Sequence, residues 1–143
     1  MRRSALPILA LVAMAACYSS SYSKGVEASV ALVSDLADKL ADYCRSDFML
    51  HGRPVSSEEM GEFYYALRKA RSFAAMTEKS AERPSYQRFG QLLDAYQGFV
   101  QAADQYRLSG KPNPETLETL LGRHQEVKRR ARLVLEAVRA EPR

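Results

Sequence analysis

The chain has 143 residues, with 21 basic and 17 acidic side chains and a formal net charge of +4. This length is enough for one domain that buries a single core without disulfides. If residues 1–16 are removed as an export signal, Arg2 and Arg3 leave with them, and 19 basic residues face 17 acidic ones. Such a near-neutral exported chain is not expected to bind nucleic acid.

Residues 1–16 have the pattern of a secretory signal peptide. Arg2 and Arg3 give a positively charged start, an apolar run extends from Ala5 to Ala16, and the run ends in small residues. This run is too short for a membrane-spanning helix, which needs roughly 20 apolar residues. The sequence therefore predicts that the protein is exported.

The end of this segment, Met14-Ala15-Ala16-Cys17, resembles the lipobox of bacterial lipoproteins. The resemblance implies that Cys17 is lipidated on its sulfur and becomes the first residue of the mature chain. Two or three acyl chains would anchor the protein firmly, because each buried methylene contributes about 0.8 kcal/mol. Met14 departs from the family pattern, which usually has Leu, Val or Ile at this place.

Tyr18, rather than Asp, follows the cysteine. By the same resemblance, this favours the outer membrane, with the protein facing the periplasm. A competing interpretation is cleavage after Ala15, which would release a soluble periplasmic protein. Cys17 could then form a disulfide with Cys44, whereas lipidation leaves Cys44 unpaired in an oxidising compartment.

The Ser-rich composition of residues 17–23 predicts a polar tether between the lipidated N-terminus and a helical domain of residues 24–143. Three breaks, at 51–54, 82–84 and 109–112, divide this domain into four segments of similar length. Signals for the start of a helix follow each break. They are a capping box of Ser56 and Glu59, Pro84 at a first helical position, and Asn113 as N-cap before Pro114.

Apolar residues repeat at spacings of three and four within each segment, as in Val26, Val30, Val33, Ala37 and Leu40. This repeat indicates amphipathic helices, and no run has the alternation of a strand. Four such helices joined by short turns predict an all-α fold, an antiparallel up-down four-helix bundle. The alternatives are a three-helix core with one helix displaced, and a dimer that completes its bundle between two chains.

Charge supports contact between the first and last helices. Residues 24–49 carry two more acidic than basic residues, and residues 113–140 carry two more basic than acidic ones. An up-down bundle makes these two helices neighbours. We therefore expect the acidic side chains of the first helix to lie level with residues 123–128; they are Asp35, Asp38 and Asp42.

Two histidines and one cysteine are the candidates for a metal or haem site. His124 lies on the apolar stripe of the fourth helix, and Cys44 lies on the core face of the first, near the end occupied by His51. They lack the local spacing of a zinc or copper motif, and there is no C-x-x-C-H sequence for covalent haem. We expect no cofactor and a hydrogen-bonded His124 at the core boundary; a small-ligand, metal or haem-binding bundle is the alternative.

The densest basic run lies in the fourth helix and ends at Arg132. Acidic residues one turn away can pair with Arg130 and Arg132, and the acidic first helix can reach Arg123 or Lys128. Arg129 is then the residue with the fewest partners. We expect Arg129, Lys128 and Arg123 to form a docking face, although an ordinary solvated helix face is the simpler interpretation.

No catalytic or phosphate-binding motif occurs in the sequence, so we do not expect an enzyme. The combined features indicate a membrane-anchored lipoprotein on the periplasmic side that acts as a helical interaction or structural module of the cell envelope. The expected partners are the membrane, through the N-terminal lipid, and an envelope protein. The domain is expected to be a monomer or a homodimer.

Overall fold

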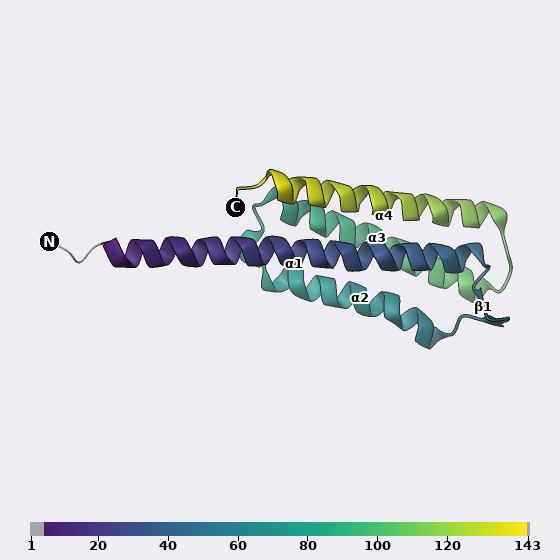
Figure 1. The fold of residues 1–143 in the computed structure, drawn as a ribbon. Helices are drawn as coiled ribbons and strands as arrows, with labels where there is room; N and C mark the ends of the chain where they lie inside the picture. Colours follow the sequence, from purple (N-terminus) through teal and green to yellow (C-terminus); the bar gives the residue numbers. More distant parts are fainter. Residues whose placement is uncertain (1–4, 143) are drawn as a thin grey trace.

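The computed structural model describes the backbone of residues 5–142 and the side chains of residue 18 and residues 20–142. Four helices form an antiparallel up-down bundle (Figure 1), with α1 at Ala5–Arg45, α2 at Ser57–Met76, α3 at Pro84–Ser109 and α4 at Pro114–Ala140. Each helix packs against two neighbours, and α1 lies beside α4. The expected all-α four-helix bundle is confirmed within a single chain.

The expected helix starts are confirmed in atomic detail. The Ser56 hydroxyl accepts a hydrogen bond from the backbone N–H of Glu59, whose carboxylate accepts one from the backbone N–H of Ser56. The side chain of Asn113 accepts bonds from the first turn of α4, and Pro84 and Pro114 occupy first helical positions. These contacts satisfy N–H groups that a helix start leaves without partners.

The start of α3 has a different arrangement. Arg83, its N-cap residue, makes no side-chain capping bond. Instead, the carboxylate of Glu141, just after α4, accepts bonds from the backbone N–H of Ser85 at 2.7 Å and from its hydroxyl at 2.8 Å. A carboxylate at this end of a helix also interacts favourably with the helix dipole. The end of α4 therefore caps the start of α3.

A short hairpin separates α1 from α2, although the sequence predicted no strand. Met49–Leu50 (β1) pairs antiparallel with Arg53–Pro54 (β2). Strands of two residues are too short to show an alternating pattern. Phe48 is buried against Tyr106, and this contact holds the loop on the bundle. Three non-glycine residues here have positive φ, an uncommon conformation: Asp47, Phe48 and His51.

The tether expected at residues 17–23 is not present as an extended segment, because α1 continues unbroken through these residues. Tyr22 is only 2% exposed, and its hydroxyl lies 2.9 Å from the Ser85 hydroxyl. The Tyr18 hydroxyl lies 2.9 Å from that of Ser80 in the 3-10 helix η1 (Glu78–Ser80), which joins α2 to α3. Side chains four residues apart share a helix face. The bundle therefore begins at Tyr18 rather than at residue 24.

An aromatic cluster fills this end of the core. Phe73 of α2 lies between Tyr22 and Phe89, with ring centroids 6.5 and 6.2 Å away. Gly25 allows the Phe73 ring to lie directly on the backbone of α1, because a Cβ at this position would be 2.4 Å from the ring.

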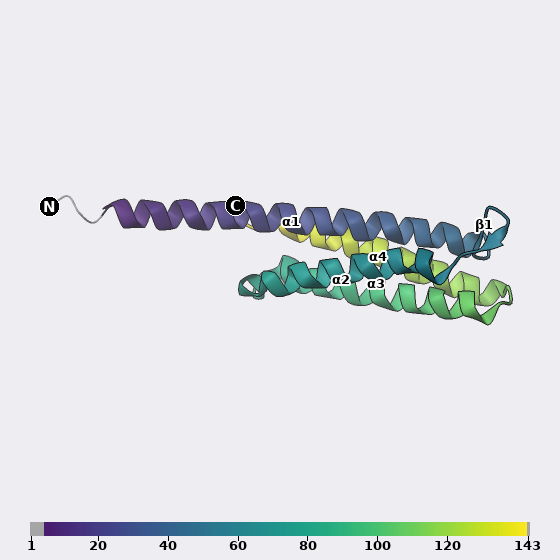
Figure 2. The same ribbon diagram turned by 90° about the horizontal axis from the view of Figure 1, so that it is seen from below.

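Beyond the cluster, the N-terminal part of α1 extends past the other helices (Figure 2). Within residues 5–142, no helix has both the length and the apolar character needed to cross a membrane.

Candidate docking surface on helix α4

A polar cluster joins α4 to α1, at the level that the charge pattern predicted. The Asp38 carboxylate lies 2.8 Å from His124 Nε2 and accepts a bond from the Lys128 ammonium at 3.1 Å. Lys128 also donates to the Ser34 hydroxyl at 2.6 Å. These contacts confirm the predicted proximity for Asp38. They also show that Lys128, expected to belong to a free docking face, holds two helices together.

Two opposing effects act on the pKa of Asp38. Partial burial raises the pKa, while hydrogen bonds and positive charge from His124 and Lys128 lower it by more, so the pKa lies below its usual value. An ionised carboxylate only accepts hydrogen bonds, so His124 Nε2 is the donor. His124 Nδ1 is buried and has no partner among the described residues, and the ring packs on Phe99. His124 is therefore a hydrogen-bonded residue at the core boundary.

The residues considered for a metal or haem site are not brought together. His51 is exposed in the hairpin, whereas Cys44 is fully buried and lies about 9 Å along α1 from Asp38, the partner of His124. Burial raises the pKa of the Cys44 thiol to about 12, which disfavours the thiolate that binds metals. Over the described part of the chain, no group of three or more His, Cys, Asp or Glu residues could hold a metal ion.

The fold also bears on the alternative disulfide. Cys17 and Cys44 both belong to α1, where 1.5 Å of rise per residue separates them by about 40 Å. A disulfide requires Cα atoms within about 7 Å. The two cysteines of one chain therefore cannot be bridged while α1 is intact, and Cys44 is a free thiol.

The expectation that Arg129 has the fewest partners is wrong. Its guanidinium donates two bonds to the Glu126 carboxylate, at 2.8 and 2.7 Å. Glu126 also accepts a bond from Arg130, which in turn reaches Gln91 of α3. Hydrogen bonds from both arginines lower the pKa of Glu126 to about 2. Glu126 pairs both with Arg130, four residues away, as expected, and with Arg129, three residues away, a helical spacing that also brings two side chains together.

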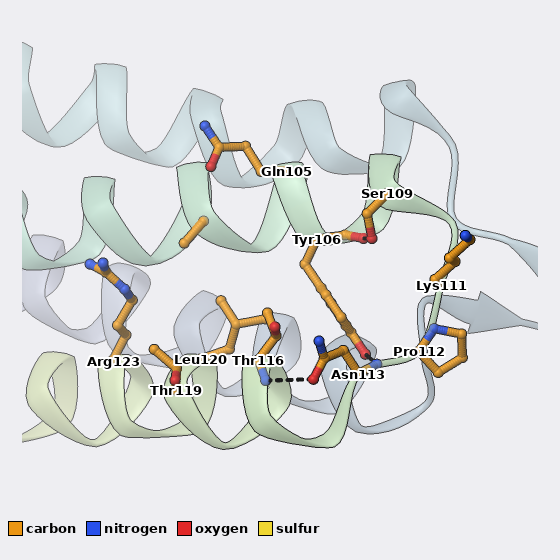
Figure 3. A pocket seen from close by; sticks show the side chains of 11 residues that line it. Gln105, Tyr106, Ser109, Lys111, Pro112, Asn113, Thr116, Thr119, Leu120 and Arg123 are labelled. Atoms are coloured by element: carbon orange, nitrogen blue, oxygen red, sulfur yellow. Dashed lines mark hydrogen bonds between the residues drawn. The ribbon is translucent and has the colours of Figure 1, made fainter.

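Three α4 cations have no ion pair or hydrogen bond among the described residues: Arg123, Arg132 and Arg139. Arg132 lines a groove of about 410 Å³ between α1 and α4. Arg123 lines a larger groove of about 600 Å³ between α3 and α4, which Lys111 also borders (Figure 3). Lys111 was not predicted from the sequence, and the predicted pairing of Arg132 with an acidic residue one turn away is not present among the described residues. A basic turn followed by threonines on α4 was the available signal for the larger groove.

Comparisons of the chain with family models, curated proteins and solved structures find no match.

Proposed function

We propose that the protein is an exported lipoprotein, anchored by lipid on Cys17 in the outer membrane, whose helical bundle faces the periplasm and docks an envelope protein. The role is structural or interactive rather than catalytic. The lipobox-like sequence at residues 14–17, after a positively charged start and an apolar run, supports the anchor.

One structural observation carries the proposal furthest. Tyr18, the residue directly after Cys17, already contacts the bundle through Ser80, and Lys79 lies 3.6 Å from the centroid of its ring. A mature chain that starts at Cys17 would lose the protruding part of α1 and keep every described contact of Tyr18 and Tyr22. Lipid on Cys17 would then attach directly to one end of a rigid bundle.

The opposite end of the bundle carries the hairpin and the turn between α3 and α4 (Figure 1). Residues 18–45 of α1 span about 40 Å. A bundle anchored at Cys17 can therefore present surfaces well away from the bilayer without a flexible linker. Arg123 lies in the half of α4 nearer this end and has no partner among the described residues, whereas Lys128 and Arg129 already have partners.

The anchor is tested with the full-length protein expressed in a Gram-negative host and labelled with an alkyne fatty acid. We expect wild type to carry the label and to enter the detergent phase on phase separation. Cys17→Ser should abolish both, whereas Cys44→Ala, the matched control, should keep both. Mass spectrometry that finds a mature chain beginning at Ala16 without lipid would show a soluble periplasmic protein instead.

A further inference from the structure

The charged side chains that line the groove between α3 and α4 are all positive. It contains Lys111 and Arg123 together with neutral side chains, and no carboxylate is among its lining residues. Glu115 and Glu118 lie on α4 but do not line it. Figure 3 shows Arg123 and Lys111 at opposite ends of the groove. Along α4, Arg123 lies about 15 Å from the N-cap Asn113, two residues after Lys111.

These two cations differ from most arginines of the domain in having no internal counter-charge. Neither Lys111 nor Arg123 makes a hydrogen bond or ion pair with any residue that the structure describes. By contrast, Arg107 pairs with Asp104, and Arg129 pairs with Glu126. The groove therefore has two uncompensated positive charges, which attract anionic groups.

The remaining lining suits a polypeptide. Pro112, which is exposed, and Ala102, which is partly exposed, provide an apolar surface over the buried Leu120. The Gln105 amide and the Thr116 hydroxyl have no hydrogen-bond partner among the described residues. Tyr106 is buried, and its hydroxyl accepts a bond from the backbone N–H of Asn113, so its ring is not available to stack on a sugar. Exposed stacking aromatics, which commonly hold carbohydrates, do not line this groove.

We propose that this groove binds an acidic amphipathic segment of a partner protein. Carboxylates of the segment pair with Lys111 and Arg123, an apolar side chain lies on Pro112 and Ala102, and Gln105 and Thr116 bond to its polar groups. This inference rests on the proposed docking function and specifies the chemistry of the partner. It also moves the docking site from the outer face of α4, where Arg129 lies, to the side of α4 that faces α3.

The test uses purified full-length protein in detergent micelles and fluorescence anisotropy. The probe is a fluorescein-labelled 12-residue peptide that contains Glu and Leu, and the comparison peptide has Gln in place of every Glu. We expect the Glu peptide to bind and the Gln peptide not to bind. Lys111→Gln and Arg123→Gln should each weaken binding about 2- to 5-fold, and the double variant about 4- to 25-fold. Added salt should weaken binding further.

Two further variants separate specific pairing from general charge. Arg68→Gln with Lys69→Gln removes two exposed cations of α2 that have no partner among the described residues. No residue of α2 lines the groove, so this double variant should leave binding within 2-fold. Gly98→Ala keeps the charge of Arg123 and moves its guanidinium by only a few tenths of an ångström, because a Cβ at position 98 would lie 3.2 Å from Arg123 Nη1 at the flexible end of that side chain. We expect this variant to bind within 2-fold of wild type, with the fold unchanged by circular dichroism.

Equal weakening by the α2 double variant, or equal binding of the Gln peptide, would overturn the proposal. Tighter binding of an oligogalacturonate than of the Glu peptide would also overturn it, in favour of an anionic glycan. The labelling test at Cys17 is independent of these outcomes. If the protein is lipidated but does not bind the Glu peptide, only the proposed binding groove is refuted. If the chain binds the peptide but carries no lipid, only the proposed anchor at Cys17 is refuted.

Discussion

Replacement of Tyr22 decides whether the residues after Cys17 form a tether or part of the bundle. A tether predicts almost no change in stability, because its side chains are solvated in both the folded and the unfolded state. The structure predicts the opposite. Tyr22 is 2% exposed and stacks on Phe73. Loss of a buried aromatic side chain typically costs about 3 to 5 kcal/mol, and we expect a cost in this range for Tyr22→Ala.

Tyr22→Phe measures the contribution of the Tyr22 hydroxyl alone to the free energy of unfolding. Ser85 donates its own hydroxyl hydrogen to Glu141, so Tyr22 is the donor in its bond to Ser85. Removal of this bond should cost about 0.5 to 1.5 kcal/mol. Tyr65→Ala is the matched control, because Tyr65 is 58% exposed, and it should cost under about 0.5 kcal/mol.

The assay is urea unfolding followed by circular dichroism, with the chain from residue 17 onward and Cys17→Ser to remove the lipid. The transition should be that of a single domain, so the free energy of unfolding is well defined. If Tyr22→Ala costs no more than Tyr65→Ala, Tyr22 is not part of the core, and the bundle does not begin where we place it.

Three other substitutions test the core and the contact between α1 and α4 by the same assay. Leu93→Ala should cost about 2 to 5 kcal/mol, because Leu93 is fully buried; a loss below about 0.5 kcal/mol would contradict this packing. Gly25→Ala should destabilise the bundle by forcing the Phe73 ring off α1, and stability equal to wild type would refute that close approach. Asp38→Asn should destabilise it at pH 7. The lowered pKa means that the carboxylate contributes stability above about pH 4 and loses it as the pH falls through the folded-state pKa, so the two proteins should converge in acid. A difference that is independent of pH would refute the electrostatic explanation.

Local signals predicted most of the fold. The capping box at Ser56, the proline at position 84 and the N-cap at Asn113 each depend on residues close in sequence, and each forms as expected. The start of the bundle was not predicted, because serines made residues 17–23 appear uniformly polar. Tyr18 and Tyr22 supply the apolar face of this stretch, while Ser20 and Ser21 are exposed.

The sequence was enough to predict which parts of α1 and α4 lie side by side, but not which side chains pair on the candidate docking surface. The antiparallel order and the charge of the two helices were enough to bring Asp38 level with Lys128. The partner of each arginine was not predictable, because the Glu126 carboxylate can reach both Arg129, three residues away, and Arg130, four residues away. The groove at Lys111 depends on how α3 and α4 pack together, which apolar periodicity does not determine.

The cap that Glu141 gives to α3 has a consequence for the cooperativity of folding. Ser85 and Glu141 are 56 residues apart, so the first turn of α3 gains this partner only after α4 has formed and docked. Amide hydrogen exchange at the start of α3 should therefore report on the docking of α4 as well as on local fraying. Glu141→Gln, which weakens the charge-assisted bond, should accelerate exchange at Ser85 while leaving the Asn113-capped start of α4 protected. Two helices whose ends are linked in this way open as one unit.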